Sequence, residues 1–162
     1  MARALIVGCG CRGRLLGKRL LGEGWAVRGT SRREEGLAEI ETAGIESAQA
    51  DPNQPGTLLE LVGDVAVVHW ALGSAQGEDE AIAAIHGPRL ERVLEKLVDT
   101  PVRGFVYEAA GTVPARHLER GRAAVALAAE TWRIPVATVA ADPADATSWV
   151  EEMLSATHSL VL

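Results

Sequence analysis

The sequence has few cysteines, no long apolar run and no excess of positive charge, and each of these absences excludes a class of protein. Its two cysteines, Cys9 and Cys11, lie two positions apart, which excludes a disulfide framework and favours a reducing compartment, the cytoplasm. No run of about 18 apolar residues occurs, so we expect no contact with a membrane. The opening Met-Ala-Arg leads directly into a short apolar segment, without the core of a signal peptide. The net charge of −6 argues against binding of nucleic acid.

A metal site is also not expected. Two thiolates do not complete a tetrahedral zinc site, and no further Cys or His follows at zinc-finger spacing. The simpler interpretation of Cys9 and Cys11 is that small side chains are needed between neighbouring glycines.

The apolar pattern predicts alternating strands and helices in one domain spanning residues 1–162. Near-continuous apolar runs are typical of parallel strands that are covered on both faces. Regular alternation then predicts an α/β fold, a three-layer doubly wound parallel sheet. A glycine motif after the first strand makes this sheet the Rossmann type and favours the strand order 3-2-1-4-5-6. The expected strands are residues 4–7, 26–29, 45–49, 65–70, 104–108 and 135–140. The expected helices are residues 14–23, 34–43, 57–62, 88–98, 118–131 and 148–156, with a shorter one at 78–85.

A glycine motif follows the first predicted strand. Gly8, Gly10 and Gly13 form Gly-x-Gly-x-x-Gly, and an amphipathic stretch comes directly after them. In this context Gly8 permits the tight turn, Gly10 lets a pyrophosphate approach the backbone, and Gly13 lets the helix pack close to the strand. The helix N-terminus presents N–H groups to the phosphates. The motif therefore predicts a dinucleotide site, with Cys11 and Arg12 beside the phosphates.

The end of the second strand indicates which dinucleotide binds. An NAD site usually has Asp or Glu there to bind the ribose 2′-hydroxyl. Here the chain has Ser31, Arg32 and Arg33, and no acid occurs between Gly29 and Glu34. A guanidinium would bind a 2′-phosphate by charge-assisted hydrogen bonds. We therefore expect NADP in preference to NAD, and we group Arg28 with these arginines as part of a small phosphate site.

Four further segments resemble the extended and atypical short-chain dehydrogenase/reductases, the NAD-dependent epimerase/dehydratase group. They are Ala50-Asp51-Pro52 after strand three, residues 64–71 (Asp-Val-Ala-Val-Val-His-Trp-Ala) in strand four, residues 103–114 around strand five, and residues 134–139 in strand six. The resemblance implies that Asp51 meets the adenine and that Ala71 and Leu72 lie beside the cofactor. It also implies a homodimer formed by the helices from Pro88 to Val98 and from Leu118 to Thr131.

The sequence departs from this group at its catalytic residues. The group has two serines at the end of strand five, then a tyrosine four residues before a lysine. The corresponding residues here are Ala109, Ala110, Pro114 and Leu118, none of which can exchange a proton. Tyr107 is the only tyrosine, and both lysines precede it. The usual dyad is therefore lacking.

A second departure concerns the C-terminus. Members of the group continue into a smaller substrate-binding lobe, whereas little sequence follows strand six here. The tail at residues 157–162 is expected to form a seventh, edge strand or a packing segment.

Three other side chains are candidates for chemistry because they lie near the predicted carboxyl ends of strands. They are His69, Glu108 and His117. We expect instead that His69 is half-buried and that Glu108 and His117 are solvated. Tyr107 and Trp149 are expected in the core.

These observations favour a cytoplasmic NADP(H)-binding module, sensor or accessory subunit without the conventional dehydrogenase reaction. Two alternatives remain open. One is a reductase or epimerase that acts on a small carbonyl or sugar-like substrate through a non-standard site, and the other is an interaction scaffold without cofactor. A methyltransferase that uses S-adenosylmethionine ranks last, because its usual acid at the end of strand two is missing.

Overall fold

The computed structural model describes residues 2–161. Six parallel strands form one sheet in the order β3-β2-β1-β4-β5-β6, which confirms the predicted topology. The strands are β1 (Arg3–Val7), β2 (Ala26–Ser31), β3 (Glu46–Gln49), β4 (Val67–Trp70), β5 (Gly104–Glu108) and β6 (Val136–Val139). The helices are α1 (Cys11–Gly22), α2 (Glu34–Thr42), α3 (Pro55–Leu59), α4 (Asp79–Ile85), α5 (Pro88–Leu97), α6 (Ala115–Trp132) and α7 (Ala146–Val161).

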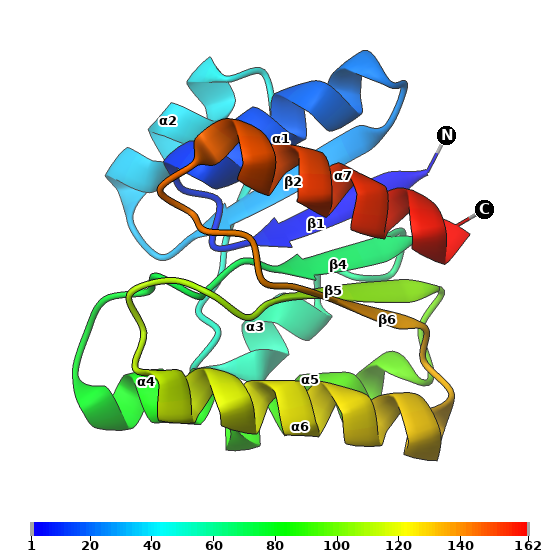
Figure 1. Ribbon diagram of the computed structural model, residues 1–162. Helices are drawn as coiled ribbons and strands as arrows, with labels where there is room; N and C mark the ends of the chain where they lie inside the picture. Colours follow the sequence, from blue (N-terminus) through cyan, green and yellow to red (C-terminus); the bar gives the residue numbers. More distant parts are fainter. Residues whose placement is uncertain (1, 162) are drawn as a thin grey trace.

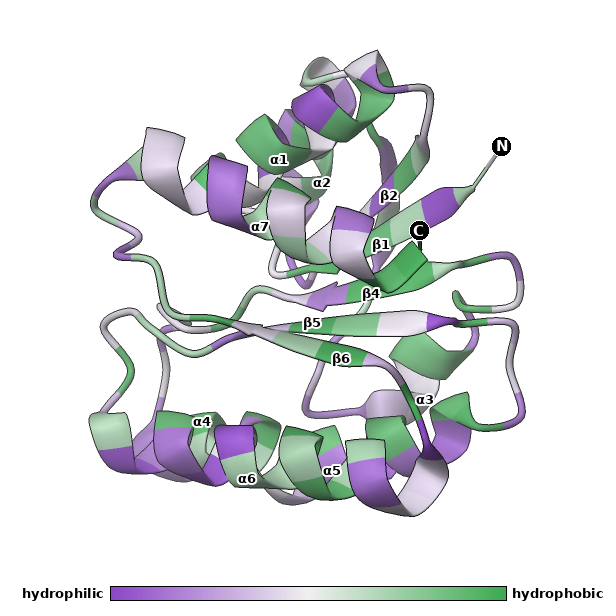
Figure 2. Cartoon of the chain, turned by 45° about the vertical axis from the view of Figure 1, so that its right-hand side comes forward, coloured by the Kyte–Doolittle hydropathy of each residue, from purple (hydrophilic) through white to green (hydrophobic). Residues whose placement is uncertain are grey.

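The helices form one layer on each face of the sheet. Figure 1 shows α1, α2 and α7 above the sheet and α3 to α6 below it. Figure 2 shows that these helices carry both hydrophobic and hydrophilic bands, as expected for helices with one face on a sheet. The sheet is thereby covered on both faces, which explains its near-continuous apolar strands.

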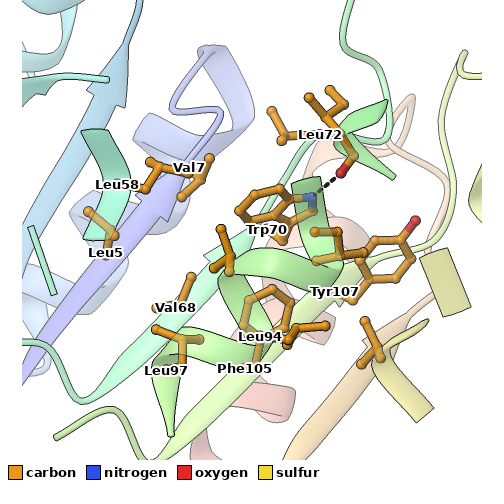
Figure 3. Close-up of a cluster of buried hydrophobic side chains, with 14 of the residues drawn as sticks. Leu5, Val7, Leu58, Val68, Trp70, Leu72, Leu94, Leu97, Phe105 and Tyr107 are labelled. Atoms are coloured by element: carbon orange, nitrogen blue, oxygen red, sulfur yellow. Dashed lines mark hydrogen bonds between the residues drawn. The ribbon is translucent and has the colours of Figure 1, made fainter. Parts of the chain in front are cut away.

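Alternate strand residues supply two separate hydrophobic cores. Leu5, Trp70, Phe105 and Tyr107 point towards the layer of α3 to α6 (Figure 3). The indole N–H of Trp70 donates to the backbone oxygen of Ile85 over 3.1 Å, which anchors α4 to the sheet. Residues of opposite parity, such as Ile6 and Val106, face α1 and α7.

The C-terminal segment corrects one expectation. The tail was expected as a seventh strand or a packing segment. It is not a strand, because α7 is helical as far as Val161, the last described residue, and its end packs against the core. Helix α7 also begins earlier than predicted, because the Asp145 carboxylate accepts the Ser148 N–H over 3.1 Å and caps the first turn. Leu160 packs against Gly104, where a Cβ would lie 2.9 Å from the Leu160 Cβ. The tail therefore contributes to the upper layer.

Arg28 lies at the amino-terminal edge of the sheet, away from the glycine loop. Its guanidinium forms ion pairs with Glu46 and, over 2.9 Å, with Asp64. It also donates to the backbone oxygen of Leu61 over 2.7 Å. These contacts hold the starts of β2, β3 and β4 together. Grouping Arg28 with a phosphate site was therefore wrong.

Within residues 2–161, no helix has both the length and the apolar character needed to cross a bilayer.

Candidate functional site

The glycine loop between β1 and α1 is the centre of the candidate site, and its first glycine is required by the backbone. Gly8 has a φ of 87°, a region that side chains disfavour. A Cβ there would also lie 2.4 Å from the backbone oxygen of Ala71 and 2.8 Å from Leu72 Cδ2. The loop therefore packs directly on the segment that leaves β4. Ala71 and Leu72 therefore lie beside the glycine loop.

The second and third glycines differ in what surrounds them. A Cβ on Gly10 would meet nothing within 4 Å, so this backbone is open to an approaching ligand. No side chain caps α1, so the N–H groups of its first turn have no side-chain acceptor at Gly10. A Cβ on Gly13 would lie 3.1 Å from the backbone oxygen of Gly8, so this glycine permits close packing of helix on strand. The geometry suits a bound phosphate.

A small cavity of about 70 Å³ lies against this loop. Its wall consists of the glycine loop with Arg12, Ala71 at the exit of β4, Glu108 at the end of β5 and Trp149 of α7. The indole N–H of Trp149 donates to Glu108 Oε2 over 2.7 Å. The N–H of Gly73 donates to Glu108 Oε1, also over 2.7 Å. The ends of β1, β4 and β5 and the starts of α1 and α7 therefore meet around this cavity.

Glu108 is buried, which corrects the expectation of a solvated loop group. It is 2% exposed. Burial raises the pKa of its carboxyl group, while the two N–H donors and the charge of Arg12 oppose that rise. The burial of Glu108 could have been predicted from the alternation of side chains along β5. Tyr107 faces α4 to α6, so the next residue, Glu108, faces α1 and α7. Trp149 as the partner of Glu108 was not predicted.

The residues after β2 lie at the other end of the loop. Arg32 and Arg33 are exposed and have no ion-pair partner among residues 2–161. The Ser31 hydroxyl accepts the N–H of Arg33 over 3.2 Å, which shapes the entry into α2. Gln49 donates to the backbone oxygen of Arg32 over 3.1 Å. Two guanidinium groups are thereby presented to solvent beside the carboxyl edge of the sheet.

Asp51 follows β3 at the same edge of the sheet and is partly buried. Its Oδ1 accepts the N–H of Asn53 over 2.8 Å, and its own N–H donates to Thr57 over 2.9 Å. Asn53 in turn donates to the backbone oxygen of Ala81 in α4. The carboxylate is therefore partly used in shaping its own turn.

His69 is fully buried under α7, not half-buried, and it does not line the cavity. Its Nε2 lies 2.7 Å from the Thr157 hydroxyl, which itself donates to the backbone oxygen of Met153. Nε2 therefore carries the hydrogen, and Nδ1 has no hydrogen-bond partner among the described residues. Burial lowers the pKa of His69 to about 4, so the ring is neutral.

His117 is also outside the cavity. Its Nε2 lies 2.9 Å from Asp79 Oδ1, and the guanidinium of Arg116 contacts the same oxygen over 2.9 Å. The side chain of His117 is 11% exposed, so the expectation of a solvated loop group was wrong. This cluster links the start of α6 to the start of α4. Of the three candidate residues, the structure brings only Glu108 to the glycine loop.

A buried pair, His86 and Tyr107, was not predicted from the sequence and lies beneath the segment that follows β4. His86 Nδ1 lies 2.6 Å from the Tyr107 hydroxyl, and its Nε2 lies 3.0 Å from the backbone oxygen of Leu72. A carbonyl only accepts, so Nε2 donates and Tyr107 donates to Nδ1. Burial lowers the pKa of His86 and raises that of Tyr107. The pair positions Leu72, which contacts Gly8.

The positions of the usual dyad hold no proton donor. Ala109 is buried, Pro114 precedes α6, and Leu118 lies in the lower core. Among the described residues, no group of three His, Cys, Asp or Glu is placed to hold a metal ion.

Comparison with solved structures shows the class of fold. UDP-glucuronic acid 4-epimerase from Bacillus cereus, solved with NAD, matches 84% of this chain and 54% of its own, at 15% identity and a TM-score of 0.68. Vestitone reductase from alfalfa matches 85% and 56%, at 19% identity and a TM-score of 0.66. Citrobacter sp. triphenylmethane reductase with NADP(H) matches 85% and 48%, at 20% identity and a TM-score of 0.63.

The chain has the Rossmann fold of NAD(P)-binding epimerases and reductases, the group that its motifs resemble. It spans about half the length of these proteins. No protein-family model matches the sequence, and no curated protein does.

The two sides of the glycine loop differ in how much room they leave for the two halves of a dinucleotide. On the side of β2 and β3, an open glycine backbone and two exposed guanidinium groups fit an adenosine with phosphates. On the side of β4 and β5, the indole of Trp149 and the carboxylate of Glu108 leave only the small cavity. The nicotinamide half does not fit this arrangement.

Proposed function

We propose that this chain is a cytoplasmic NADP(H)-binding Rossmann protein that does not carry out the conventional dehydrogenase reaction. It serves as a cofactor-binding module, sensor or accessory subunit. The observation that supports this proposal is the uncapped start of α1 at Gly10, at the same edge of the sheet as Arg32 and Arg33, which have no ion-pair partner among residues 2–161.

The preference for NADP follows from charge at the end of β2. A helix N-terminus stabilises a phosphate, and an exposed guanidinium forms charge-assisted hydrogen bonds with a second one. Such bonds contribute about 1.5–3 kcal/mol each, or roughly 10- to 100-fold in affinity. Glu34 and Glu35 follow the two arginines in the sequence and lie in the first turn of α2. Their negative charges there stabilise the N-terminus of that helix.

The lack of the usual reaction follows from Ala109, Pro114 and Leu118. No proton donor stands at these positions, and His69 and His117 are engaged elsewhere. Glu108 supports the runner-up function, a reductase or epimerase acting on a small carbonyl or sugar-like substrate. It is the one candidate acid that lines the cavity among the described residues.

The test is calorimetric titration of the chain with NADPH and with NADH. We expect NADPH to bind at least tenfold more tightly, and Arg32→Glu to reduce this difference. Arg103→Glu is the matched control, because Arg103 is exposed at the opposite, amino-terminal edge of the sheet. Equal affinities would overturn the preference for NADP. If neither nucleotide binds, the interaction scaffold is favoured. If the chain turns over a carbonyl substrate and Glu108→Gln abolishes that turnover, the reductase or epimerase is favoured.

A further inference from the structure

We infer that this site holds only the adenosine half of its nucleotide, and that Trp149 and Glu108 fill the place of the nicotinamide half. The ligand class is then a 2′-phosphorylated adenine nucleotide, recognised without regard to the redox state of any attached nicotinamide. This inference rests on the proposed function and specifies it further.

The topology places the two halves of a dinucleotide on different strands. In the order 3-2-1-4-5-6, a ligand binds across the switch point between β1 and β4. One half then lies over the ends of β2 and β3, and the other must pass Ala71 to reach the end of β5. Glu108 is the last residue of β5, so it stands on that path.

Trp149 closes the path above Glu108. Helix α7 starts at the same edge of the sheet as the glycine loop and lies beside α1 (Figure 1). Trp149 is 1% exposed, and its indole N–H donates to Glu108 Oε2 over 2.7 Å. The cavity that remains is about 70 Å³. Ligand pockets measure about 300 Å³ or more, so this space is too small for a ring with its ribose and phosphate.

The loops behind Glu108 are also packed together. The N–H of Val113 donates to the backbone oxygen of Gly73 over 3.0 Å. A Cβ on Gly111 would lie 2.1 Å from that oxygen, and Gly73 itself donates to Glu108. The segments after β4 and β5 are therefore in direct contact, and a nicotinamide ring cannot lie between them without moving both.

The other half of the site is open. A Cβ on Gly10 would have empty space around it, and Arg32 and Arg33 are solvent-exposed. The buried carboxylate of Glu108 also disfavours a second phosphate deep in the loop, because like charges repel strongly where water is excluded. Shape and charge thus both select the adenosine half.

The experiment compares three ligands on the unmodified chain: adenosine 2′,5′-bisphosphate, NADP⁺ and NADPH. Calorimetry is expected to give dissociation constants within threefold of one another. Saturation-transfer NMR with NADP⁺ is expected to show contact at the adenine protons and none at the nicotinamide protons. NADPH binding tenfold tighter than the bisphosphate, with transfer to nicotinamide protons, would overturn the inference and leave the proposed function standing. Binding of none of the three would overturn both.

Two variants then test the role of Trp149. Trp149→Ala opens the path and is expected to raise NADPH affinity at least tenfold relative to the bisphosphate. Trp132→Ala, on the exposed face of α6, is the matched control and is expected to change neither affinity. Trp149→Phe keeps most of the ring volume and is expected to behave as the unmodified chain. An unchanged ligand ratio in a folded Trp149→Ala protein would count against the inference.

Discussion

Trp149 and Glu108 are joined by a buried hydrogen bond of 2.7 Å that links helix α7 to the end of β5. The bond lies directly beside the glycine loop. It ties the last helix to the ligand-binding edge of the sheet, although the two residues are 41 positions apart in the sequence. The chemistry expected of this edge therefore depends on a contact between distant segments.

The buried carboxyl group of Glu108 is expected to make stability depend on pH. Its pKa is raised by burial, so the folded chain binds this proton more tightly than the unfolded chain. This contribution is present at low pH and is lost as pH rises above the usual range of a glutamate, about 4.3. Glu108→Gln removes it. Urea unfolding at pH 4.5 and pH 7.5 should show that the unmodified chain loses stability relative to the variant at the higher pH. A difference that is constant with pH would contradict this expectation.

His69 is expected to act in the opposite direction. Its pKa is lowered to about 4, so the unfolded chain binds the proton more tightly. Stability is then lost as pH falls from about 6.5 towards 4, by up to about 3 kcal/mol. His69→Leu removes the titrating group and should reduce this loss in urea unfolding at pH 7 and pH 4.5. Thr157→Val is the control, since it deletes the partner and keeps the histidine. Equal acid sensitivity in His69→Leu and the unmodified chain would exclude this role.

Substitution of two glycines with similar φ angles can distinguish the cost of backbone strain from the cost of a steric clash. Gly8 and Gly24 have φ of 87° and 93°, but only Gly8 faces close neighbours, with Ala71 O at 2.4 Å from an added Cβ. Gly24→Ala should cost about 1 kcal/mol from backbone strain alone. Gly8→Ala should cost clearly more, because the segment after β4 must also move. Thermal unfolding of both variants measures the difference, and equal losses would mean that the loop adapts freely.

The helices from Pro88 to Val98 and from Leu118 to Thr131 are proposed as a homodimer face. Leu127 is 63% exposed on α6, and Val98 and Trp132 are also exposed in this layer. In a two-fold dimer each substitution acts twice. Leu127→Glu should raise the dimer dissociation constant at least tenfold in analytical ultracentrifugation. Leu15→Glu, on exposed α1, should leave it unchanged, and a monomer before any substitution would refute the proposal.

The strand pattern and the glycine motif were predictable because both depend on local sequence. Apolar runs such as the one ending at Val7 identify a strand covered on both faces, and Gly-x-Gly-x-x-Gly identifies the turn that follows. Right-handed crossovers predicted a doubly wound sheet, and the glycine motif on the first strand favoured the order 3-2-1-4-5-6. Helix ends were less predictable. The start of α7 depends on the carboxylate of Asp145, and the tail after His158 lacks any strong signal for helix or strand.

The sequence by itself determined the α/β topology, the open glycine loop, the arginines after β2 and the lack of the usual dyad, since each is a property of neighbouring residues. Only the tertiary structure decided which side chains share a site. In the folded chain His69 lies buried under α7, His117 pairs with Asp79, and Arg28 lies at the amino-terminal edge of the sheet, opposite the glycine loop. The tertiary structure also brought Trp149 onto Glu108. Such pairs depend on how helices pack across the sheet, which no local pattern specifies.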